Sequence, residues 1–169
     1  GTVCKTIWYR TEVGDTQEGT RDLKSVFGKA GMFTNPKPIR LINRILDIAS
    51  QNNSIVLDFF AGSGTTGHAL LKYNAEHADS KRQFILCTNN ENDICRNVTY
   101  ERIKRVIANE GYNASLKYFR VGYISITDRM YYEYADELLL HVRELVELEN
   151  GINFTGNAEI AIILSEEEL

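Results

Sequence analysis

The sequence predicts an α/β fold with a mostly parallel sheet and flanking helices, and three observations lead to this prediction. Two apolar runs, residues 54–60 and 82–87, have the pattern of strands that are buried on both faces. A helical pattern, residues 65–76, separates them. A strand, a connecting helix and a second strand form a right-handed parallel unit in nearly all folds. The 169 residues suffice for one domain with a substantial core.

Two segments precede this unit. Residues 1–32 mix glycines, acids and bases, and we expect a loop there, including the stretch 14–20, with a short helical piece at residues 21–27. A helix is then predicted, with Asn35 as its cap, prolines in its first turn and the polar residues 50–53 at its end. Its apolar face comprises Ile39, Ile42, Ile45, Leu46 and Ala49.

Four elements are expected after the unit. Residues 97–111 read as a helix that ends at Gly111, with Val98, Ile103, Val106 and Ile107 directed inward. Residues 115–124 are predicted as a third strand, residues 134–151 as one amphipathic helix and residues 158–164 as a last strand. The helical stripe of Leu138, Val142, Leu145 and Val146 is expected in the core, with a partner contact as the alternative.

The composition is that of an ordinary globular protein, with 43% hydrophobic and 25% charged residues. No apolar run approaches the roughly 20 residues that span a bilayer, so no membrane partner is expected. Three cysteines without C-x-x-C spacing indicate reduced thiols and a cytoplasmic location, and the scattered histidines predict no metal. The net charge of −4 argues against a surface that coats DNA.

The loop after the first strand indicates a ligand. Gly62 and Gly64 allow a tight turn and a close approach to a bound molecule, and the helix that follows attracts a negative group to its first amides. The G-x-G-x-x-G spacing of residues 62–67 also occurs in dinucleotide sites. Asp58 adds a negative partner for an ammonium, which favours the amino-acid end of S-adenosylmethionine. The alternative is that Asp58 only caps a turn.

The same residues carry a family resemblance. LDFFAGSGTTGHA resembles the D-x-F-x-G-S-G-T-T signature of amino-group DNA methyltransferases (adenine-N6 and cytosine-N4), and FTNPKPIRLINRIL resembles the P-K-P helix before it. The longer strings EVGDTQEGTRDLKSVFGKAGMFTNPKP and FILCTNNENDICRNVTYERIKRVI are similar to modification subunits of type III restriction–modification systems. The resemblance implies a partial Rossmann-like S-adenosylmethionine-dependent methyltransferase fold.

Site residues follow from this resemblance, position by position. Those expected to line the methionine end of S-adenosylmethionine are Asp58, Phe60, Gly62, Ser63, Gly64 and Thr65. Those expected to close over it are Phe33, Asn35, Lys37 and Pro38, although the side chain of Lys37 has the alternative of being only solvated.

One departure from the family pattern follows the second strand. Many relatives carry an acid there, which grips both ribose hydroxyls, but this sequence has Thr88. Asn89, Asn90 and Glu91 are the candidates to replace the acid, and we select Asn89 and Glu91. The alternative is a polar cap on a helix at Asp93.

A second departure concerns catalysis. The family's D-P-P-Y tetrapeptide is absent, because Pro36 and Pro38 are the only prolines, so no catalytic residue is assigned. In relatives with this motif order the tetrapeptide lies upstream, and we expect the chain to be the C-terminal part of a longer enzyme, inactive alone. The expected division is a connector (residues 1–32), a cofactor-binding core (33–124) and a C-terminal helix-strand extension (125–169).

The functional prediction is the cofactor-binding part of a site-specific DNA adenine-N6 methyltransferase that acts in restriction–modification. The resemblance implies three partners: double-stranded DNA through the full-length enzyme, a restriction subunit and a second modification subunit. Two alternatives remain open. One is a fragment of an NAD-dependent oxidoreductase, and the other is a non-catalytic module that docks a partner.

Overall fold

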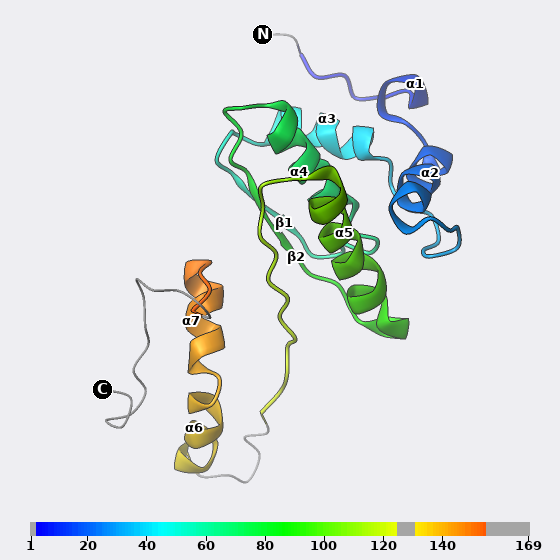
Figure 1. The fold of residues 1–169 in the computed structure, drawn as a ribbon. Helices are drawn as coiled ribbons and strands as arrows, with labels where there is room; N and C mark the ends of the chain where they lie inside the picture. The colour runs from blue at the N-terminus through cyan, green and yellow to red at the C-terminus, as the bar shows by residue number, and fades with distance from the viewer. Residues whose placement is uncertain (1–2, 125–130, 155–169) are drawn as a thin grey trace. The chain divides into compact units, whose positions relative to one another are not determined.

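The computed structural model describes residues 3–124 and 131–154. The chain divides into two compact units, Gly1–Tyr118 and Phe119–Leu169. In the first unit the elements are α1 (Arg10–Val13), α2 (Thr16–Phe27), α3 (Ile39–Ala49), β1 (Ile55–Asp58), α4 (Thr65–Glu76), β2 (Gln83–Leu86), η1 (Glu91–Asp93), η2 (Cys95–Tyr100) and α5 (Glu101–Glu110), as Figure 1 shows. The second unit contains α6 (Tyr131–Leu139) and α7 (Val142–Asn150).

The centre of the first unit is the expected strand-helix-strand arrangement. β1 and β2 pair in parallel, with Ile55 opposite Gln83 and Asp58 opposite Leu86. α4 connects the two strands and begins and ends as predicted, at Thr65 and Glu76. The prediction of an α/β chain with a parallel sheet is therefore confirmed at the level of this small sheet.

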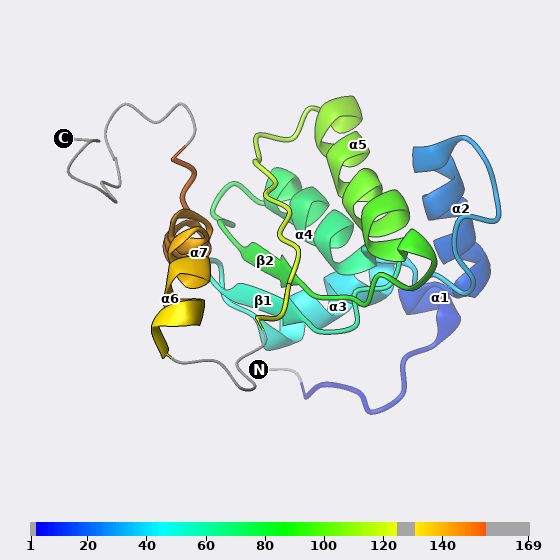
Figure 2. The same cartoon turned by 90° about the horizontal axis from the view of Figure 1, so that it is seen from below.

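Two apolar clusters hold this unit together. In one, Leu46 of α3 packs with Leu70 and Tyr73 of α4 against the sheet, and in the other, Leu71 of α4 packs with Ile103 and Val106 of α5. Figure 2 shows α4 and α5 together on one side of the two strands. The core of the unit therefore lies between this side of the sheet and the helices.

The opposite face of the sheet departs from the prediction. Ile55 is 63% exposed and Leu57 is 49% exposed, whereas both strands were expected to be buried on both faces. The outward residue of β2, Ile85, is 47% exposed. The prediction was wrong for the described residues because the helices that pack on the strands contact only the inward side chains.

The N-terminal segment is more helical than predicted. The prediction of a loop at residues 14–20 was wrong, because α2 begins at Thr16 and the short helix α1 precedes it. The carboxylate of Asp15 accepts a hydrogen bond of 2.9 Å from the backbone N–H of Glu18, a typical helix cap. α2 ends at Phe27 and is followed by Gly28, whose φ of 71° is left-handed.

α2 packs tightly against the segment before α3. A Cβ at Gly19 would clash with the carbonyl oxygen of Pro36, so only glycine allows this approach. The guanidinium of Arg40 donates two hydrogen bonds of 2.7 Å to the carboxylate of Glu18. Together these contacts tie α2 to the Pro-Lys-Pro stretch at residues 36–38 and to the first turn of α3.

α3 begins later than its expected cap. Asn35 has a φ of 58° and is not the cap, because the helix starts after Pro38, and its first N–H, that of Ile39, donates to the carboxylate of Asp22 at 3.2 Å. The left-handed backbone at Asn35 turns the chain before the two prolines instead. The predicted end is confirmed, since α3 ends at Ala49. On the apolar face, Leu46 is buried but Ile45 is 41% exposed.

The segment after β2 matches its prediction in part. η2 and α5 together replace the helix expected at residues 97–111, and the helix ends at Gly111 with a φ of 69°, as predicted. Val98, Ile103 and Val106 are buried as expected. The strand predicted at residues 115–124 was wrong, because the described backbone there pairs with no strand. Leu116 packs instead against the second apolar cluster.

The second unit contains two helices where one was expected. A turn at Leu140 and His141 separates α6 from α7, and α7 ends at Gly151 in the left-handed conformation, as predicted. Leu138 and Leu145 of the expected core stripe are 43% and 52% exposed, so the prediction was wrong for these two residues, whereas Val142 and Val146 are half-buried. The strand predicted at residues 158–164 lies outside the described residues. No helix of the described part is both long enough and apolar enough to cross a bilayer.

Candidate functional site

The candidate site lies at the carboxyl ends of β1 and β2. The backbone N–H of Cys87 donates to the carbonyl of Asp58 at 2.7 Å, and the N–H of Ala61 donates to the carbonyl of Cys87 at 3.0 Å. These two bonds bring the loop after β1 and the segment after β2 to one edge of the sheet. Ligands of open parallel sheets bind beyond this edge.

Two glycines shape the loop after β1. Gly62 and Gly64 have φ values of 49° and 74°, which residues with a Cβ rarely adopt. A Cβ at Gly62 would also stand 3.0 Å from Cζ of Phe33, and one at Gly64 would stand 3.2 Å from Cγ2 of Thr99. The loop therefore requires glycine at both positions, for its backbone conformation and for space.

Asp58 supports the turn at the end of β1. One carboxylate oxygen accepts a hydrogen bond of 3.0 Å from the N–H of Phe60, and the other accepts one of 2.6 Å from the hydroxyl of Thr66. Asp58 therefore has the structural role that was its alternative prediction, the capping of a turn. Each carboxylate oxygen has further lone pairs, so the same geometry leaves acceptor capacity for a cationic ligand.

The start of α4 brings positive potential to the same loop. Gly64 precedes the helix in the left-handed conformation, and no side chain caps it. The first amides of a helix have no intrahelical acceptor and carry the positive end of its dipole. An acidic group at Asp58 and an anion-attracting helix end thus lie on the two sides of one short loop.

A buried arginine, which sequence reasoning missed, lies against this loop. Arg102 of α5 is fully buried, and its Nη1 donates to the hydroxyl of Thr65 at 2.9 Å and to the carbonyl of Ser63 at 3.2 Å. Its Nη2 is buried without an acceptor among the described residues. The sequence signal was a charged residue at an inward position of an amphipathic helix, next to Ile103 and one turn before Val106.

Arg102 also sets the state of a neighbouring histidine. Burial lowers the pKa of Arg102 to about 10, so the side chain remains charged at neutral pH. Burial, and then the charge of Arg102, lowers the pKa of His68 to about 4. Nε of Arg102 donates to Nδ1 of His68 at 3.3 Å, which leaves the proton of the neutral ring on Nε2, 3.4 Å from Glu110.

The Pro-Lys-Pro stretch joins the loop from another direction. The hydroxyl of Thr65 donates to the carbonyl of Lys37 at 3.2 Å, and the ring of Phe33 lies against Gly62. The side chain of Lys37 is exposed, Pro38 is buried, and Asn35 is exposed. Of the four residues expected to close over the ligand, the structure brings Phe33 and the backbone of Lys37 into contact with the loop.

The polar residues after β2 are available to a ligand. Asn89 and Glu91 are both exposed, and their side chains lie 3.5 Å apart. Asn90 instead donates to the carboxylate of Asp93 at 3.0 Å, as the polar-cap alternative suggests for that residue. At the end of β1, Phe60 is 93% exposed. The edge of the sheet thus presents an aromatic ring beside β1 and polar groups beside β2.

The chemistry of this edge is that of a binding site. It combines a carboxylate, an anion-attracting helix start with a buried cation beneath it, and exposed aromatic and polar side chains. Among the described residues, no group of three or more His, Cys, Asp or Glu side chains is placed to hold a metal ion.

Comparison with known proteins gives a consistent result. A family model described as a DNA methylase, of the N6/N4 methyltransferase type, matches residues 1–135. The chain is 38% identical over 112 residues to the Mod subunit of the type III restriction-modification enzyme StyLTI of Salmonella typhimurium. It is 42% identical over 87 residues to the EcoPI Mod subunit of Escherichia phage P1, and 31% identical over 85 residues to the type II methyltransferase M.KpnI of Klebsiella pneumoniae.

These similarities cover about half of this chain and a small share of each relative. The matched part is 59%, 52% and 50% of this chain. It is 17%, 13% and 20% of the three relatives, in the same order. The chain therefore spans only a fraction of the length of the proteins that it resembles.

Proposed function

The chain belongs to the DNA methylase family of N6/N4 methyltransferases, and from this premise we propose that it is the S-adenosylmethionine-binding part of a DNA adenine-N6 methyltransferase of the modification-subunit type. The proposed architecture is the corresponding part of a Rossmann-like methyltransferase fold. One observation carries the proposal: the carboxylate of Asp58 and the uncapped start of α4 lie together at the two ends of the glycine loop, with Asp58 accepting a hydrogen bond of 2.6 Å from Thr66 in the first turn of α4.

This arrangement fits the amino-acid end of S-adenosylmethionine better than a pyrophosphate. An α-amino acid presents an ammonium and a carboxylate a few bonds apart. Asp58 suits the ammonium, and the first amides of α4, with the charge of Arg102 beneath them, suit the carboxylate. A pyrophosphate needs only the positive side of this loop and gains nothing from Asp58.

Each predicted site residue has a proposed task. Gly62, Ser63, Gly64 and Thr65 form the cradle of the methionine end, which any Cβ at the two glycines would crowd. Phe60 lines the methionine end with them, and Phe33, Asn35, Lys37 and Pro38 close over the ligand. Asn89 and Glu91 hold the ribose in place of the missing acid. When bound, the cofactor supplies a methyl group on a sulfonium. The residues of this chain bind and orient that group.

Catalysis is proposed to need residues that this chain does not contain. An exocyclic amine of a base needs an acceptor for its N–H and an aromatic wall that holds the flipped base. The D-P-P-Y tetrapeptide that fills these roles in the resembled family is absent from the sequence. We therefore place the catalytic step in a longer protein, and the similarity to type III Mod subunits favours adenine as its target.

The proposed partners follow from the same similarity. They are double-stranded DNA, a restriction subunit and a second modification subunit, each engaged through the longer protein. A cytoplasmic location is part of the proposal. The three cysteines are free thiols, which fits a reducing compartment.

Calorimetric titration of the chain with S-adenosylmethionine, S-adenosylhomocysteine and NAD tests the cofactor. We expect binding of the first two with dissociation constants above micromolar, and no binding of NAD. Tight NAD binding without S-adenosylmethionine binding would overturn the assignment and favour the oxidoreductase alternative. Failure to bind any of the three would favour the alternative of a non-catalytic module that docks a partner.

Transfer of a labelled methyl group to mixed-sequence duplex DNA tests the division of labour. We expect none from this chain alone, because the base-binding motif is absent. Transfer by the chain alone would show that catalytic residues lie within these 169 residues. The titration above remains informative in either case, since cofactor binding does not depend on the catalytic motif.

A further inference from the structure

A basic pocket lies next to the candidate cofactor site but outside it. The pocket has a volume of about 440 Å³ and is lined from two sides, by the chain at the end of α2 and by η2 with the first turns of α5. Its polar lining includes four cations, Lys29, Arg96, Lys104 and Arg105. Its aromatic lining consists of Phe27 and Tyr100.

The pocket is positive although the chain is acidic. Glu101 is the one carboxylate of the lining, and it pairs with Lys104 at 3.8 Å and with Arg105 at 3.3 Å. Lys29 and Arg96 have no carboxylate within 4.0 Å among the described residues. Four cations against one carboxylate contrast with the formal net charge of −4 for the whole chain.

The aromatic rings hold two of the cations in place. The guanidinium of Arg105 lies 4.8 Å from the ring centre of Phe27, and Nζ of Lys104 lies 5.9 Å from that of Tyr100. Both distances are within the range of cation–π contact. The charges of these long side chains are thereby partly ordered before a ligand arrives, which lowers the entropy cost of binding.

Each of the two walls of the pocket is next in sequence to a residue that contacts the glycine loop. Tyr100 directly follows Thr99, whose hydroxyl donates to the carbonyl of Gly62 at 2.6 Å. Met32, also in the lining, directly precedes Phe33, whose ring lies against Gly62. A ligand in the pocket would therefore sit beside the loop that is proposed to hold the cofactor.

The charge of the pocket disfavours the cofactor itself as the occupant. S-adenosylmethionine has no phosphate, and its sulfonium and ammonium outweigh its one carboxylate, so four cations would repel its net positive charge. The pocket instead suits a ligand with closely spaced negative charges, and Lys and Arg side chains are the usual partners of nucleic-acid phosphates.

We propose that the pocket formed by Lys29, Arg96, Lys104 and Arg105 binds the phosphodiester backbone of duplex DNA beside the methyl-donor site. This proposal rests on the proposed function and adds to it a DNA contact made by this chain. The contact would position the duplex without reading its sequence, because phosphates carry no base information.

The test measures binding of the chain to a labelled mixed-sequence duplex by fluorescence anisotropy at several salt concentrations. We expect weak binding, with a dissociation constant of roughly 10⁻⁴ to 10⁻⁶ M and a linear dependence of its logarithm on the logarithm of salt concentration. The double variant Lys29→Ala/Arg96→Ala should reduce the magnitude of that slope by about 2, since each lost phosphate contact removes about 0.9. Neither side chain has an ion pair to lose among the described residues.

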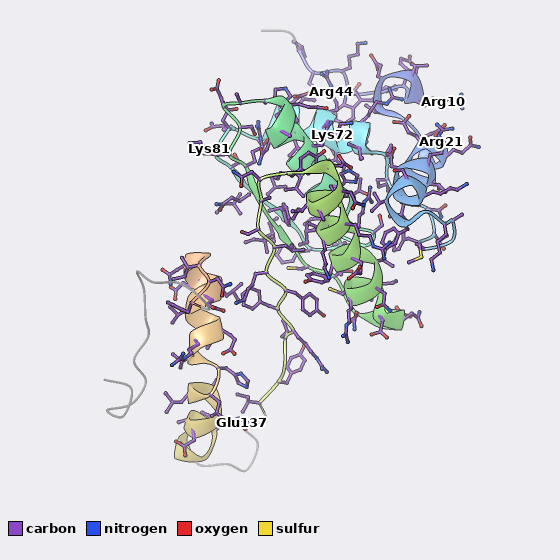
Figure 3. The ribbon with its side chains drawn as sticks, in the orientation of Figure 1. Arg10, Arg21, Arg44, Lys72, Lys81 and Glu137 are labelled. Carbon is purple, nitrogen blue, oxygen red and sulfur yellow. The ribbon has the colours of Figure 1, made fainter. Side chains whose placement is uncertain are left out.

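Lys72→Ala/Lys81→Ala is the matched control, because it removes the same charge elsewhere. Lys72 lies on α4 and Lys81 just before β2, toward the opposite end of the sheet, and both are labelled in Figure 3. We expect the slope of this control to equal that of the unaltered chain. An equal loss in both variants would mean that only net charge matters, and it would overturn the proposal.

Two further outcomes would also overturn the proposal. One is that the unaltered chain fails to bind duplex DNA at low salt. The other is that the pocket variant loses affinity for inorganic phosphate but not for the duplex, which would indicate a small-anion site. S-adenosylmethionine is titrated against both variants in parallel, with unchanged affinity expected. If the unaltered chain does not bind S-adenosylmethionine, that result counts against the proposed function and not against the DNA contact.

Discussion

Arg102 donates a hydrogen bond of 2.9 Å from Nη1 to the hydroxyl of Thr65, across 37 residues of sequence. The same nitrogen reaches the carbonyl of Ser63, and Nε reaches His68. The loop and α4 thus supply acceptors for Nη1 and Nε of this fully buried charge, whereas Nη2 has no acceptor among the described residues. Such a charge costs free energy to bury, so its bonds to the loop are strongly coupled to the loop's conformation.

Arg102→Lys is expected to destabilise the fold and weaken cofactor binding together. Lysine keeps the charge but lacks the planar fork that reaches Thr65, Ser63 and His68 at once. We expect a loss of about 1–3 kcal/mol in the free energy of unfolding, the cost of buried polar groups left unsatisfied. Denaturant unfolding and calorimetry measure the two effects. Arg105→Ala, three residues along the same helix and 44% exposed, is the control and should change stability by less than about 1 kcal/mol.

Asp58→Ala is expected to weaken S-adenosylmethionine binding by about 1.5–3 kcal/mol, the range for a hydrogen bond to a charged group. Because Asp58 also accepts from Thr66, the variant loses some stability for a purely structural reason. Thr66→Val separates the two effects, since it removes that bond and keeps the carboxylate. If both variants bind the cofactor equally well, Asp58 is only a structural cap.

Gly64→Ala is expected to destabilise the chain more than Gly28→Ala. The two glycines have similar left-handed φ values, 74° and 71°, so the backbone strain of a Cβ is alike, about 1–2 kcal/mol. At Gly64 a Cβ would also stand 3.2 Å from Cγ2 of Thr99, whereas at Gly28 nothing lies within 4 Å. Thermal unfolding of both variants measures the difference, which is the cost of crowding in the loop. Equal losses of stability in the two variants would show that the loop shifts to accommodate the added Cβ.

His68 makes the stability of the fold depend on pH. Its pKa of about 4 lies below the ordinary value of 6.5, so between these values the unfolded chain binds a proton that the folded chain does not. The contribution of neutral His68 is complete above pH 6.5 and is lost as the pH falls toward 4. His68→Gln should therefore lose stability less steeply across this window, as measured by Tm at several pH values. His141→Gln, at an exposed position of the second unit, should follow the unaltered chain.

Local patterns were sufficient to predict the central unit. The strand, glycine loop, helix and second strand of residues 55–86 formed where apolar runs, two glycines and a helical period indicated them. The family was recognisable from the same stretch, because a loop that holds a ligand needs defined residues at defined spacing. Helix ends at Gly111 and Gly151 were predicted for a similar reason, since left-handed backbone favours glycine.

Other features depended on contacts that no local pattern encodes. Residues 115–124 have the composition of a strand, but they have no strand partner in the described structure, and Leu116 packs against a helix cluster instead. Asn35 looked like a helix cap, but the contacts of Gly19 with Pro36 position that segment. Each of these outcomes is decided by the surface that the segment meets after folding.

The sequence by itself determined the local conformations around Gly62 and Gly64 and the chemical types available at that loop, because torsional preference and residue identity are properties of the chain alone. Only the tertiary structure decided that Arg102 lies beneath the loop and that Lys29 shares a pocket with Arg96. Arg102 and His68, which share a hydrogen bond, are 34 residues apart along the chain, and Lys29 and Arg96, which share the pocket, are 67 residues apart. Such pairs form when α5 packs against α4 and α2, and packing depends on the complementary shape of whole helix faces.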